Sequence, residues 1–406
     1  MRILHTSDWH LGKSLEGFSR LEEQEQFVDD FIDIVNKNNI DLVIISGDIY
    51  DSGNPPAKAE SLFYKALKGI ESKNRAVFII AGNHDNPERL TAVSPITLDK
   101  GIIILGTPES RIFSGCSMVK DSGPCYVELE INGERVVIAA LPYPSEKRLN
   151  DIWNKGDEKE SQKSYDEKIG EIFRDLEKKF RKDTINIAVS HIFMTGGDVS
   201  DSERPIELGG SLAVSYKSLP QKAQYIALGH LHKPQKVKGG NLNAYYSGSP
   251  LQYSRSEIGY SKECYIVDVK AGEEAKVSQV FFRNYKPIEV WKCENIDEAI
   301  EKCRENSRRS VWVYLEIKTD KYISQEDIKT MKELKSDIIE IRPVIEGQEE
   351  KDEGYEDFRE KSMKELFKDF YLSERGVEPK EEVLDAFLKI AGESDGEGDE
   401  DETALS

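Results

Sequence analysis

The sequence has few cysteines, few histidines and no long hydrophobic run, and each scarcity excludes a class of protein. Its 5 cysteines among 406 residues are scattered without a CxxC spacing, which excludes a disulfide framework and a thiolate zinc site. No apolar stretch approaches the roughly 20 residues that a membrane-spanning helix needs. The N-terminal sequence MRILHTSD turns polar too early for a secretory signal. We therefore expect a cytoplasmic protein.

Positive charge is also scarce. The chain has 76 acidic and 56 basic residues, which give a net charge of -20. This balance argues against broad attraction to a nucleic-acid backbone, so an anionic substrate must be captured locally. The composition is otherwise that of a globular protein, and the length favours two or three domains.

Five short apolar runs, rich in β-branched residues, are each followed by polar residues. Runs of this kind suit strands that are buried on both faces, in an α/β sheet with helices on each side. Because ligands bind at the carboxyl ends of strands in such sheets, we expect the polar side chains to form one site. The runs cover residues 2–7, 42–46, 77–81, 185–190 and 225–228, and the polar residues that follow are Asp8, His10, Asp48, Asn83, His84, Asp85, His191, His230 and His232.

Glycine precedes the polar residues after three of these runs, at Gly47, Gly82 and Gly229. A chain that leaves a strand at such a point needs an unusual backbone angle or a close approach between segments. We expect these glycines to direct the neighbouring side chains inward.

The polar residues supply oxygen and nitrogen donors without sulfur, enough for two metal ions that share one carboxylate. Mixed carboxylate and imidazole donors suit Mn, Fe or Zn better than Mg or Ca. Two cations about 3.5 to 4 Å apart can clamp a phosphoryl oxygen and lower the pKa of a bridging water. We interpret the set as a dinuclear metallophosphoesterase centre.

The alternative is that each histidine is structural. A single histidine on a buried strand is more often a hydrogen-bonded core residue than a ligand, and we interpret His5 in that way. A lone HxH such as His230 and His232 also occurs by chance. The combination of strand-end motifs favours metal binding, because five of the 6 histidines lie in these motifs.

The motifs resemble those of a known family. DxH at residues 8–10, GD at 47–48, GNHD at 82–85, His191 and GHxH at 229–232 are similar to the calcineurin-like metallophosphoesterases. The longer segments MRILHTSDWHLGK, ISGDIYDSGNPP, AGNHDNPERL and ALGHLHKPQ, followed by YSGSP, resemble the SbcD nuclease subunits of bacterial SbcCD complexes, which are relatives of eukaryotic double-strand-break repair nucleases. The resemblance covers residues 1–250 and implies an α/β sandwich of mixed sheets flanked by helices.

The resemblance also implies roles for the site residues. Two Mn²⁺ ions are expected, with Mg²⁺ or another divalent ion as the alternative. His84 would donate a proton to the leaving sugar oxygen or orient the phosphate, and Asp85 would hold its ring. Asp8, His10, Asp48 and His232 would hold one ion, and Asp48, Asn83, His191 and His230 the other.

Two positions near the GD motif depart from relatives. Archaeal and eukaryotic members of this group carry a histidine where this chain has Asp51. Asp51 is therefore either a second acid or transition-state contact or a cap of the helix that Pro55 and Pro56 help begin, and we favour the cap. Ser52 stands where Ser/Thr phosphatases have an arginine that grips phosphate, and Asp85 replaces the glutamate of their GNHE. Both departures favour a phosphodiester over a phosphomonoester.

The chain divides into four predicted parts. Residues 1–283 form the nuclease domain, 284–346 a small α/β cap domain, 347–390 a linker with two helices, and 391–406 an acidic disordered tail. The cap pattern predicts strands at 288–291, 311–317 and 338–344, with helices near 297–303 and 325–334. The resemblance implies that the C-terminal helices bind SbcC, an ATPase with a long coiled coil, and that the cap limits which DNA reaches the site.

The helix expected at 57–70 has two interpretations. Its apolar stripe normally means packing on the home sheet. The resemblance offers pairing across the two-fold axis of a homodimer, with Phe63, Leu67 and Leu90 as contacts.

We expect a Mn-dependent DNA nuclease, with single-strand endonuclease and duplex 3′–5′ exonuclease activity, that processes DNA ends and hairpins with SbcC in replication, recombination and repair. The alternative enzyme is a phosphatase acting on a small-molecule or protein phosphomonoester. A third hypothesis makes the metals structural and the chain a docking subunit. Candidate phosphate contacts are Lys13, Arg20, Arg89, Lys233 and Arg255, although scattered bases are more often solvated surface.

Overall fold

The computed structural model describes residues 1–112, 115–145, 148–149, 164–203, 212–319 and 322–344, and single positions between 364 and 387. Within it, Met1–Ile317 and Ile323–Arg342 form one compact unit. None of its described helices has the length and apolar character to cross a membrane.

The first sheet has six strands in the order β15-β14-β1-β4-β5-β6. The strands from β1 to β6 run parallel, and β14 and β15 add an antiparallel edge. Three of these strands, β1, β4 and β5, end beside the motifs, as the apolar runs predict. Their bounds are β1 Arg2–Thr6, β4 Leu42–Ser46, β5 Ala76–Ile80, β6 Ile102–Leu105, β14 Glu263–Asp268 and β15 Lys276–Phe281.

The second sheet has seven strands in the order β12-β13-β11-β10-β9-β8-β7. Its centre, from β13 to β9, is parallel, and both edges are antiparallel. The bounds are β7 Val119–Gly123, β8 Tyr126–Ile131, β9 Glu134–Leu141, β10 Ile185–His191, β11 Tyr225–Gly229, β12 Gln235–Lys236 and β13 Ala244–Tyr246.

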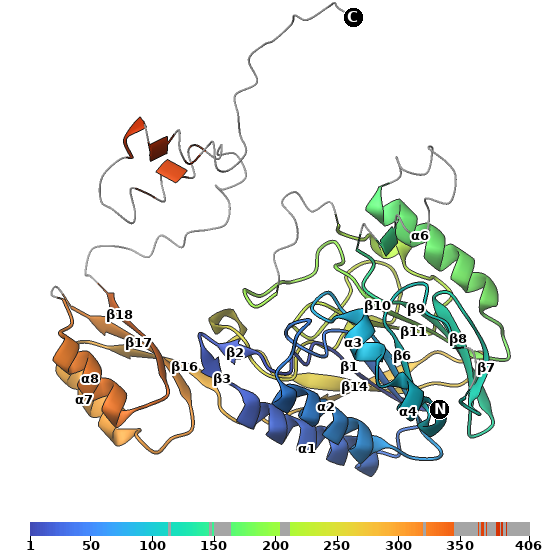
Figure 1. Cartoon of the computed structure of the whole chain (residues 1–406), viewed down its shortest axis with the longest axis horizontal. Helices are drawn as coiled ribbons and strands as arrows, with labels where there is room; N and C mark the ends of the chain where they lie inside the picture. The colour runs from blue at the N-terminus through green and yellow to red at the C-terminus, as the bar shows by residue number, and fades with distance from the viewer. Residues whose placement is uncertain are drawn as a thin grey trace, which may run out of the picture. The chain divides into compact units, whose positions relative to one another are not determined.

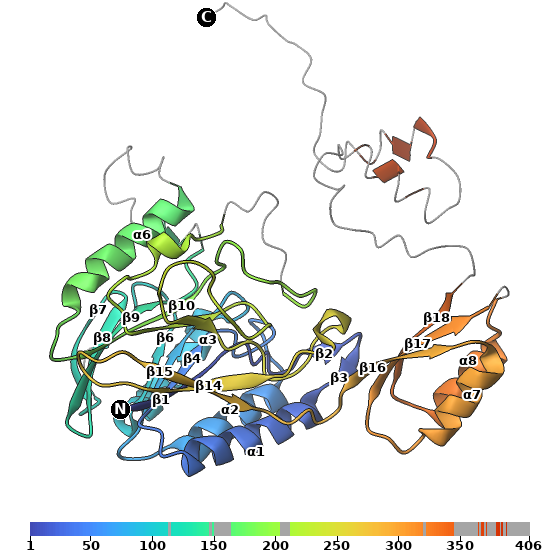
Figure 2. The same ribbon diagram turned by 180° about the vertical axis from the view of Figure 1, so that it is seen from behind.

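The two sheets stack face to face, with helices on both outer faces (Figures 1 and 2). The inner core joins residues such as Ile44 of β4 and Ile187 of β10. Helices α1 (Leu21–Lys37) and α2 (Ala57–Ile70) cover the first sheet, and α6 (Tyr165–Leu176) covers the second. The sandwich of mixed sheets predicted from the sequence is therefore confirmed. The shorter elements are β2 Ser14–Leu15, β3 Phe18–Ser19, α3 Pro87–Thr91, α4 Ser94–Thr97, η1 Leu98–Lys100, η2 Glu177–Lys179, η3 Tyr216–Ser218 and η4 Arg255–Glu257.

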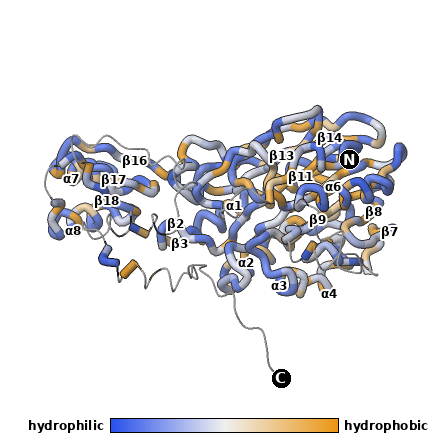
Figure 3. The backbone as a smooth tube through the Cα atoms, turned by 90° about the horizontal axis from the view of Figure 1, so that it is seen from above, coloured by the Kyte–Doolittle hydropathy of each residue, from blue (hydrophilic) through white to orange (hydrophobic). Residues whose placement is uncertain are grey.

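The helices show the amphipathic pattern that such packing requires. Hydrophobic and hydrophilic residues alternate along their tubes in Figure 3. On α2 the side chains of Phe63 and Leu67 are buried against the home sheet, and so is Leu90 of α3. The proposed dimer contacts at these three residues are therefore wrong, because their side chains are already packed in the core.

A small α/β module follows the second sheet. It contains β16 (Ile288–Cys293), α7 (Ile296–Glu305), β17 (Trp312–Lys318), α8 (Gln325–Leu334) and β18 (Ile338–Val344). Asn295 and Ser324 cap the two helices by accepting a hydrogen bond from the backbone three residues on. The five elements predicted here are present. The linker and partner-binding helices predicted at 347–390 lie outside the described residues except at single positions, and the predicted tail at 391–406 lies wholly outside them.

Candidate metal centre

The candidate ligands come from the carboxyl ends of strands in both sheets. Asp8 and His10 follow β1, Asp48 follows β4 and Asn83 follows β5; His191 ends β10, while His230 and His232 follow β11. Backbone hydrogen bonds join the first two segments, from Asp8 N to Gly47 O (3.0 Å) and from His10 N to Asp48 O (3.0 Å). The predicted convergence of the motifs is thus present in the structure.

Several ligands sit on strained backbone. The φ angles are 53° at Asp8, 46° at His10, 51° at Asp48 and 108° at His230. Residues other than glycine seldom adopt positive φ, at a cost of order 1–3 kcal/mol each. Such conformations persist only where the surroundings determine them, and they cluster at functional sites.

The glycines make room for the ligands. A Cβ atom at Gly47 would collide with the imidazole of His191, and one at Gly82 would collide with the Asp48 carboxylate. Gly47 also has a positive φ of 94°. The close approach predicted from the sequence is confirmed, because any larger residue at either glycine would displace a ligand.

The first group of ligand atoms lies around His10 and His232. Their Nε2 atoms are 2.9 Å apart, and His10 Nε2 is 3.6 Å from Asp48 Oδ2. Asp8 offers a carboxylate oxygen within 4.8 Å of both imidazoles. Ligand atoms bound about 2.0–2.2 Å from one ion lie roughly 3 Å from each other, so this spacing fits a shared cation.

The second group lies around His191. Its Nε2 is 2.8 Å from Asn83 Oδ1 and 3.3 Å from Asp48 Oδ2, while His230 Nδ1 is 3.1 Å from the same Asn83 oxygen. The Nδ1 of His191 donates to the carbonyl of Ser46 (2.9 Å), so the Nε2 lone pair faces the cluster when the ring is neutral. Asp48 is the residue common to both groups.

Burial and neighbouring charges set the protonation of these groups. Burial raises the pKa of Asp8 to about 8 and lowers the pKa of His10 to about 4 and of His230 to about 3. Burial opposes the ionisation of Asp48, but the charge of His191 outweighs it and keeps the pKa of that carboxyl well below its ordinary value. Burial likewise opposes protonation of His191, and the Asp48 carboxylate raises that pKa to about 9. The neutral His10 and His230 retain the lone pairs that metal binding requires.

His84 lies beside this cluster. Its side chain is nearly buried, and its ring nitrogen lies within 4.8 Å of ligand atoms of His10 and Asp48. Its Nδ1 donates to the carbonyl of Asp51 (2.7 Å), and its backbone N–H donates to Asp48 Oδ1 (2.9 Å). The structure therefore brings together His84 and the seven candidate ligands.

Asp85 links two loops of the site. Its carboxylate accepts hydrogen bonds from the backbone N–H groups of Ile49, Tyr50 and Gly82. These bonds tie the loop after β4 to the loop after β5. The ring Nδ1 of His84 donates to the Asp51 carbonyl (2.7 Å), and the expectation that Asp85 holds this ring stays a prediction.

Asp51 lies beside the candidate ligands and does not take the favoured capping role. Helix α2 has Pro56 at its N-cap and no side-chain cap, so the capping role expected for Asp51 is wrong. Its Oδ1 instead lies 3.0 Å from Lys13 Nζ and 3.5 Å from His10 Nδ1. The signal was available, since Asp51 closely follows Asp48 in a motif already assigned to the site.

His5 is a core residue, as predicted. It is fully buried, with Nδ1 2.8 Å from the hydroxyl of Tyr225 and Nε2 2.9 Å from the hydroxyl of Ser46. Burial lowers its pKa to about 3, so it is a neutral hydrogen-bonding residue between the sheets.

Comparison with known proteins identifies the family. The calcineurin-like phosphoesterase family model matches residues 1–234, and the model of the type 5 capsule protein repressor C-terminal domain (SbcD_C) matches residues 284–375. The SbcD subunit of nuclease SbcCD from Bacillus subtilis (strain 168) is 43% identical over 395 residues, which are 96% of this chain and 98% of that protein. The chain belongs to the SbcD family. The SbcD subunit of nuclease SbcCD from Rhodobacter capsulatus is 33% identical over 280 residues, 67% of each chain.

Membership of the SbcD family confirms the calcineurin-like fold, and together with the cluster of possible ligand residues it indicates that the protein binds divalent metal. The chain also matches solved structures at low sequence identity. TT1561 of Thermus thermophilus and a dimetal phosphatase from Danio rerio each cover 68% of this chain and 98% of their own, at 11% identity. Their TM-scores are 0.35 and 0.37.

In this SbcD-family chain, the five basic residues near the motifs are all paired with acids. Arg20 is buried, so it is neither the solvated surface residue nor the phosphate contact that the sequence suggested. Each of the other four basic residues would have to break its ion pair with an acidic side chain before it could contact a phosphate. The pairs are Lys13–Asp51 (3.0 Å), Arg20–Glu23 (2.8 Å), Arg89–Glu60 (2.9 Å), Lys233–Asp198 (2.7 Å) and Arg255–Glu316 (2.5 Å).

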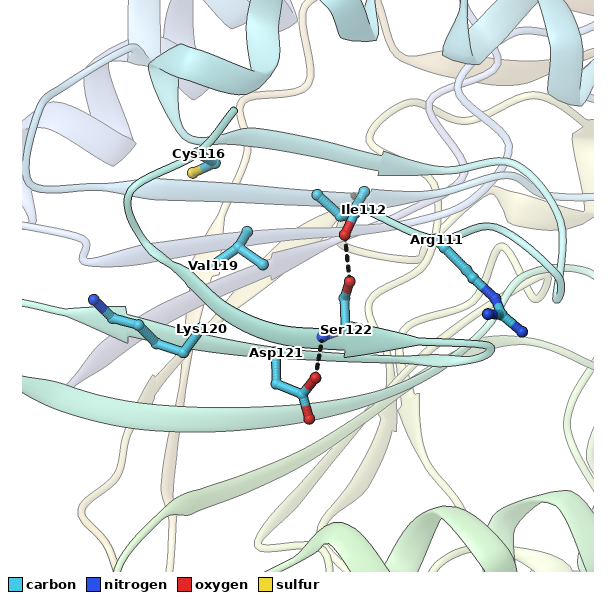
Figure 4. Close-up of a pocket in the computed structure, with 7 residues that line it drawn as sticks. All are labelled: Arg111, Ile112, Cys116, Val119, Lys120, Asp121 and Ser122. Carbon is cyan, nitrogen blue, oxygen red and sulfur yellow. Dashed lines mark hydrogen bonds between the residues drawn. The ribbon is translucent and has the colours of Figure 1, made fainter. Parts of the chain in front are cut away.

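A pocket of about 400 Å³ lies by β7, away from the metal centre (Figure 4). Ser122 donates its hydroxyl to the Ile112 carbonyl (2.5 Å) and its backbone N–H to Asp121 Oδ1 (2.9 Å). None of the described residues that line this pocket belongs to the candidate metal-ligand groups.

Proposed function

We propose that this protein is the nuclease subunit of an SbcCD-type complex and hydrolyses phosphodiester bonds in DNA. The supporting observation is a buried set of oxygen and nitrogen donors that converges on the Asp48 carboxylate in an SbcD-family chain. The proposed activities are endonuclease cleavage of single strands and 3′–5′ exonuclease cleavage of duplex ends. They would process DNA ends and hairpins during replication, recombination and repair.

The proposed cofactors are two Mn²⁺ ions, which suit mixed imidazole and carboxylate ligands. Bound divalent ions supply positive charge that polarises a phosphate and lowers the pKa of bound water. The amide of Asn83 adds a ligand oxygen without a negative charge that would repel the substrate. Asp8, His10, Asp48 and His232 are the proposed ligands of one ion, and Asp48, Asn83, His191 and His230 those of the other.

His84 is the proposed proton donor to the leaving sugar oxygen. The hydrogen bond from its Nδ1 to the Asp51 carbonyl fixes the ring and assigns proton exchange to Nε2. Asp85 contributes indirectly, since its three backbone hydrogen bonds hold the loop that carries His84 against the loop that carries Asp48.

Aromatic rings beside the ligands support a nucleotide substrate. Tyr143 and Phe193 are partly exposed, and their ring centroids lie 6.2 Å from His191 and 6.3 Å from His230. Bases stack on aromatic rings without regard to sequence, at about 1–3 kcal/mol per base. With Ser52 in place of the arginine that phosphatases use, these features favour a nucleic-acid diester over a phosphomonoester.

The proposed partner is an SbcC-type ATPase, bound through helices within residues 347–390, in a cytoplasmic complex that contains two copies of each chain. Two tethered amphipathic helices commonly dock on another protein. Removal of residues 350–406 should leave manganese nuclease activity intact and abolish co-purification with SbcC. Co-purification of the shortened chain would contradict this interface.

Two substrates test the function. Purified protein is incubated with Mn²⁺ and either labelled hairpin DNA or p-nitrophenyl phosphate, and Asp48→Asn is the matched negative control. We expect cleavage of the DNA, little release of nitrophenol and no cleavage by the variant. Rapid turnover of the monoester alone would support the phosphatase, and no turnover of either substrate would support a docking role for the chain.

A further inference from the structure

A buried polar chain lies behind His232, the proposed ligand of the first ion. Ser202 Oγ is 2.5 Å from both His232 Nδ1 and Glu257 Oε1. His232 and Glu257 are 1% and 0% exposed. The three residues come from the loop before β11, the loop after β11 and η4, so only the folded chain brings them together.

The direction of these hydrogen bonds follows from their chemistry. Glu257 accepts from the Lys262 ammonium at Oε2 and from the backbone N–H of Tyr253 at Oε1 (3.1 Å), which is the bonding pattern of a carboxylate. A carboxylate only accepts hydrogen bonds, so the Ser202 hydroxyl donates to it. The hydroxyl has one hydrogen, and it therefore accepts from His232 Nδ1. His232 must then carry its proton on Nδ1, which leaves the Nε2 lone pair toward His10.

Lys262 completes the arrangement. Its Nζ donates to Glu257 Oε2, to the hydroxyl of Ser249 (2.9 Å) and to the backbone carbonyl of His232 (3.0 Å). The ammonium balances the carboxylate charge, which would otherwise be costly in a buried position. The same ion pair thus fixes both the ring and the backbone of His232.

We infer that Ser202 and Glu257 are positioning residues that orient His232 and raise the affinity of the first metal ion. Outer partners of a metal-bound histidine fix its tautomer and raise its basicity, and their loss typically costs about 10–100-fold in affinity. The inference rests on the proposed function only in that the centre binds two ions.

Metal binding by the full chain tests the inference. Ser202→Ala removes the bridging hydroxyl but leaves the Glu257–Lys262 pair, while Ser202→Thr restores a hydroxyl. Ser200→Ala is the control, because Ser200 Oγ is 2.9 Å from Ser202 Oγ but forms no part of the link from His232 to Glu257. Mn²⁺ is titrated without DNA and followed by electron paramagnetic resonance and calorimetry.

We expect Ser202→Ala and Glu257→Gln to weaken one of two Mn²⁺ sites by about 10–100-fold and to leave the other unchanged. Ser202→Thr and Ser200→Ala should bind as wild type does. Wild-type affinity at both sites in Ser202→Ala would overturn the inference, and so would equal loss at both sites with a lowered melting temperature in metal-free buffer. If the wild-type chain itself bound no ion, the proposed function would fail as well, so the two failures are distinguishable.

Discussion

The Asp48 carboxylate connects every part of the centre. Its Oδ2 lies 3.6 Å from His10 Nε2 and 3.3 Å from His191 Nε2, which belong to different ligand groups. Its Oδ1 accepts the backbone N–H of His84 (2.9 Å). A carboxylate between two dications screens their repulsion, so this one side chain would hold both proposed ions while it also positions the backbone of His84.

The role of His84 can be separated from metal binding. His84→Ala should keep its metal content near that of wild type, because none of the seven proposed ligands is removed. DNA cleavage should fall by about 10²–10⁴-fold, the usual contribution of general acid catalysis. Metal analysis and single-turnover kinetics measure the two effects. Loss of the ions or full activity would contradict the assignment.

At the scale of single residues, the sequence predicts the candidate ligands but not the residues that hold them in place. Asp8, His10 and Asp48 stand directly after apolar runs, so local sequence places them at strand ends. Asp51 was misread because the nearby prolines are a local capping signal, whereas its contact with Lys13 exists only in the folded chain. Ser202 and Glu257 have no motif, since 55 residues separate them.

At the scale of elements, α2 shows how packing decides between two interpretations of one apolar stripe. Phe63 is 0% exposed and lies 6.4 Å from the Trp9 ring, whereas the adjacent Tyr64 is 43% exposed. Periodicity gives the stripe but does not say whether a sheet or another chain covers it. The structure assigns the stripe to the home sheet.

The pair of adjacent aromatic residues provides a matched test. Phe63→Ala should lower the free energy of unfolding by about 3–5 kcal/mol, because it leaves a cavity in a packed core. Tyr64→Ala should change it by less than about 1 kcal/mol, as expected for an exposed side chain. Urea denaturation of both variants measures the difference. Similar losses would mean that α2 is covered on its outer side as well.

The α/β module depends on a carboxylate between two lysines. Asp337 accepts from Lys286 Nζ (2.8 Å) and from Lys335 Nζ, whose side chain is 0% exposed. Burial opposes ionisation of Asp337, but hydrogen bonds from the two lysines outweigh it and lower its pKa. The carboxylate therefore stabilises the module above the unfolded pKa of about 3.9, and this contribution is lost as the pH falls through the lower folded pKa.

Asp337→Asn should consequently be less stable than wild type by about 1–3 kcal/mol near neutral pH. The difference should shrink as the pH drops below about 4, where the wild-type carboxyl also becomes neutral. Urea denaturation across this pH range measures both values. A difference that stayed constant with pH would show that the carboxylate charge is not responsible.

At the scale of the whole molecule, the order of the strands was the part that sequence could not supply. β1 pairs with β4 on one side and with β14 on the other, and Ile3 lies opposite both Leu42 and Val267. The apolar runs predict that these strands exist and are buried. Their pairing depends on contacts between residues more than 250 positions apart, which no local pattern encodes.

Charge across the molecule predicts how this chain binds DNA alone. The net charge is -20, and the basic residues nearest the motifs are all paired with acids. Each phosphate contact contributes about 0.9 to the slope of log affinity against log salt. We expect fewer than about three contacts and so a slope smaller than about 3. The Asp48→Asn variant, in which we expect no cleavage, allows the slope to be measured by fluorescence anisotropy on hairpin DNA between about 50 and 200 mM salt. A slope of about 6 or more would contradict local capture, whereas a steeper slope only when SbcC is added would place most phosphate contacts on the partner.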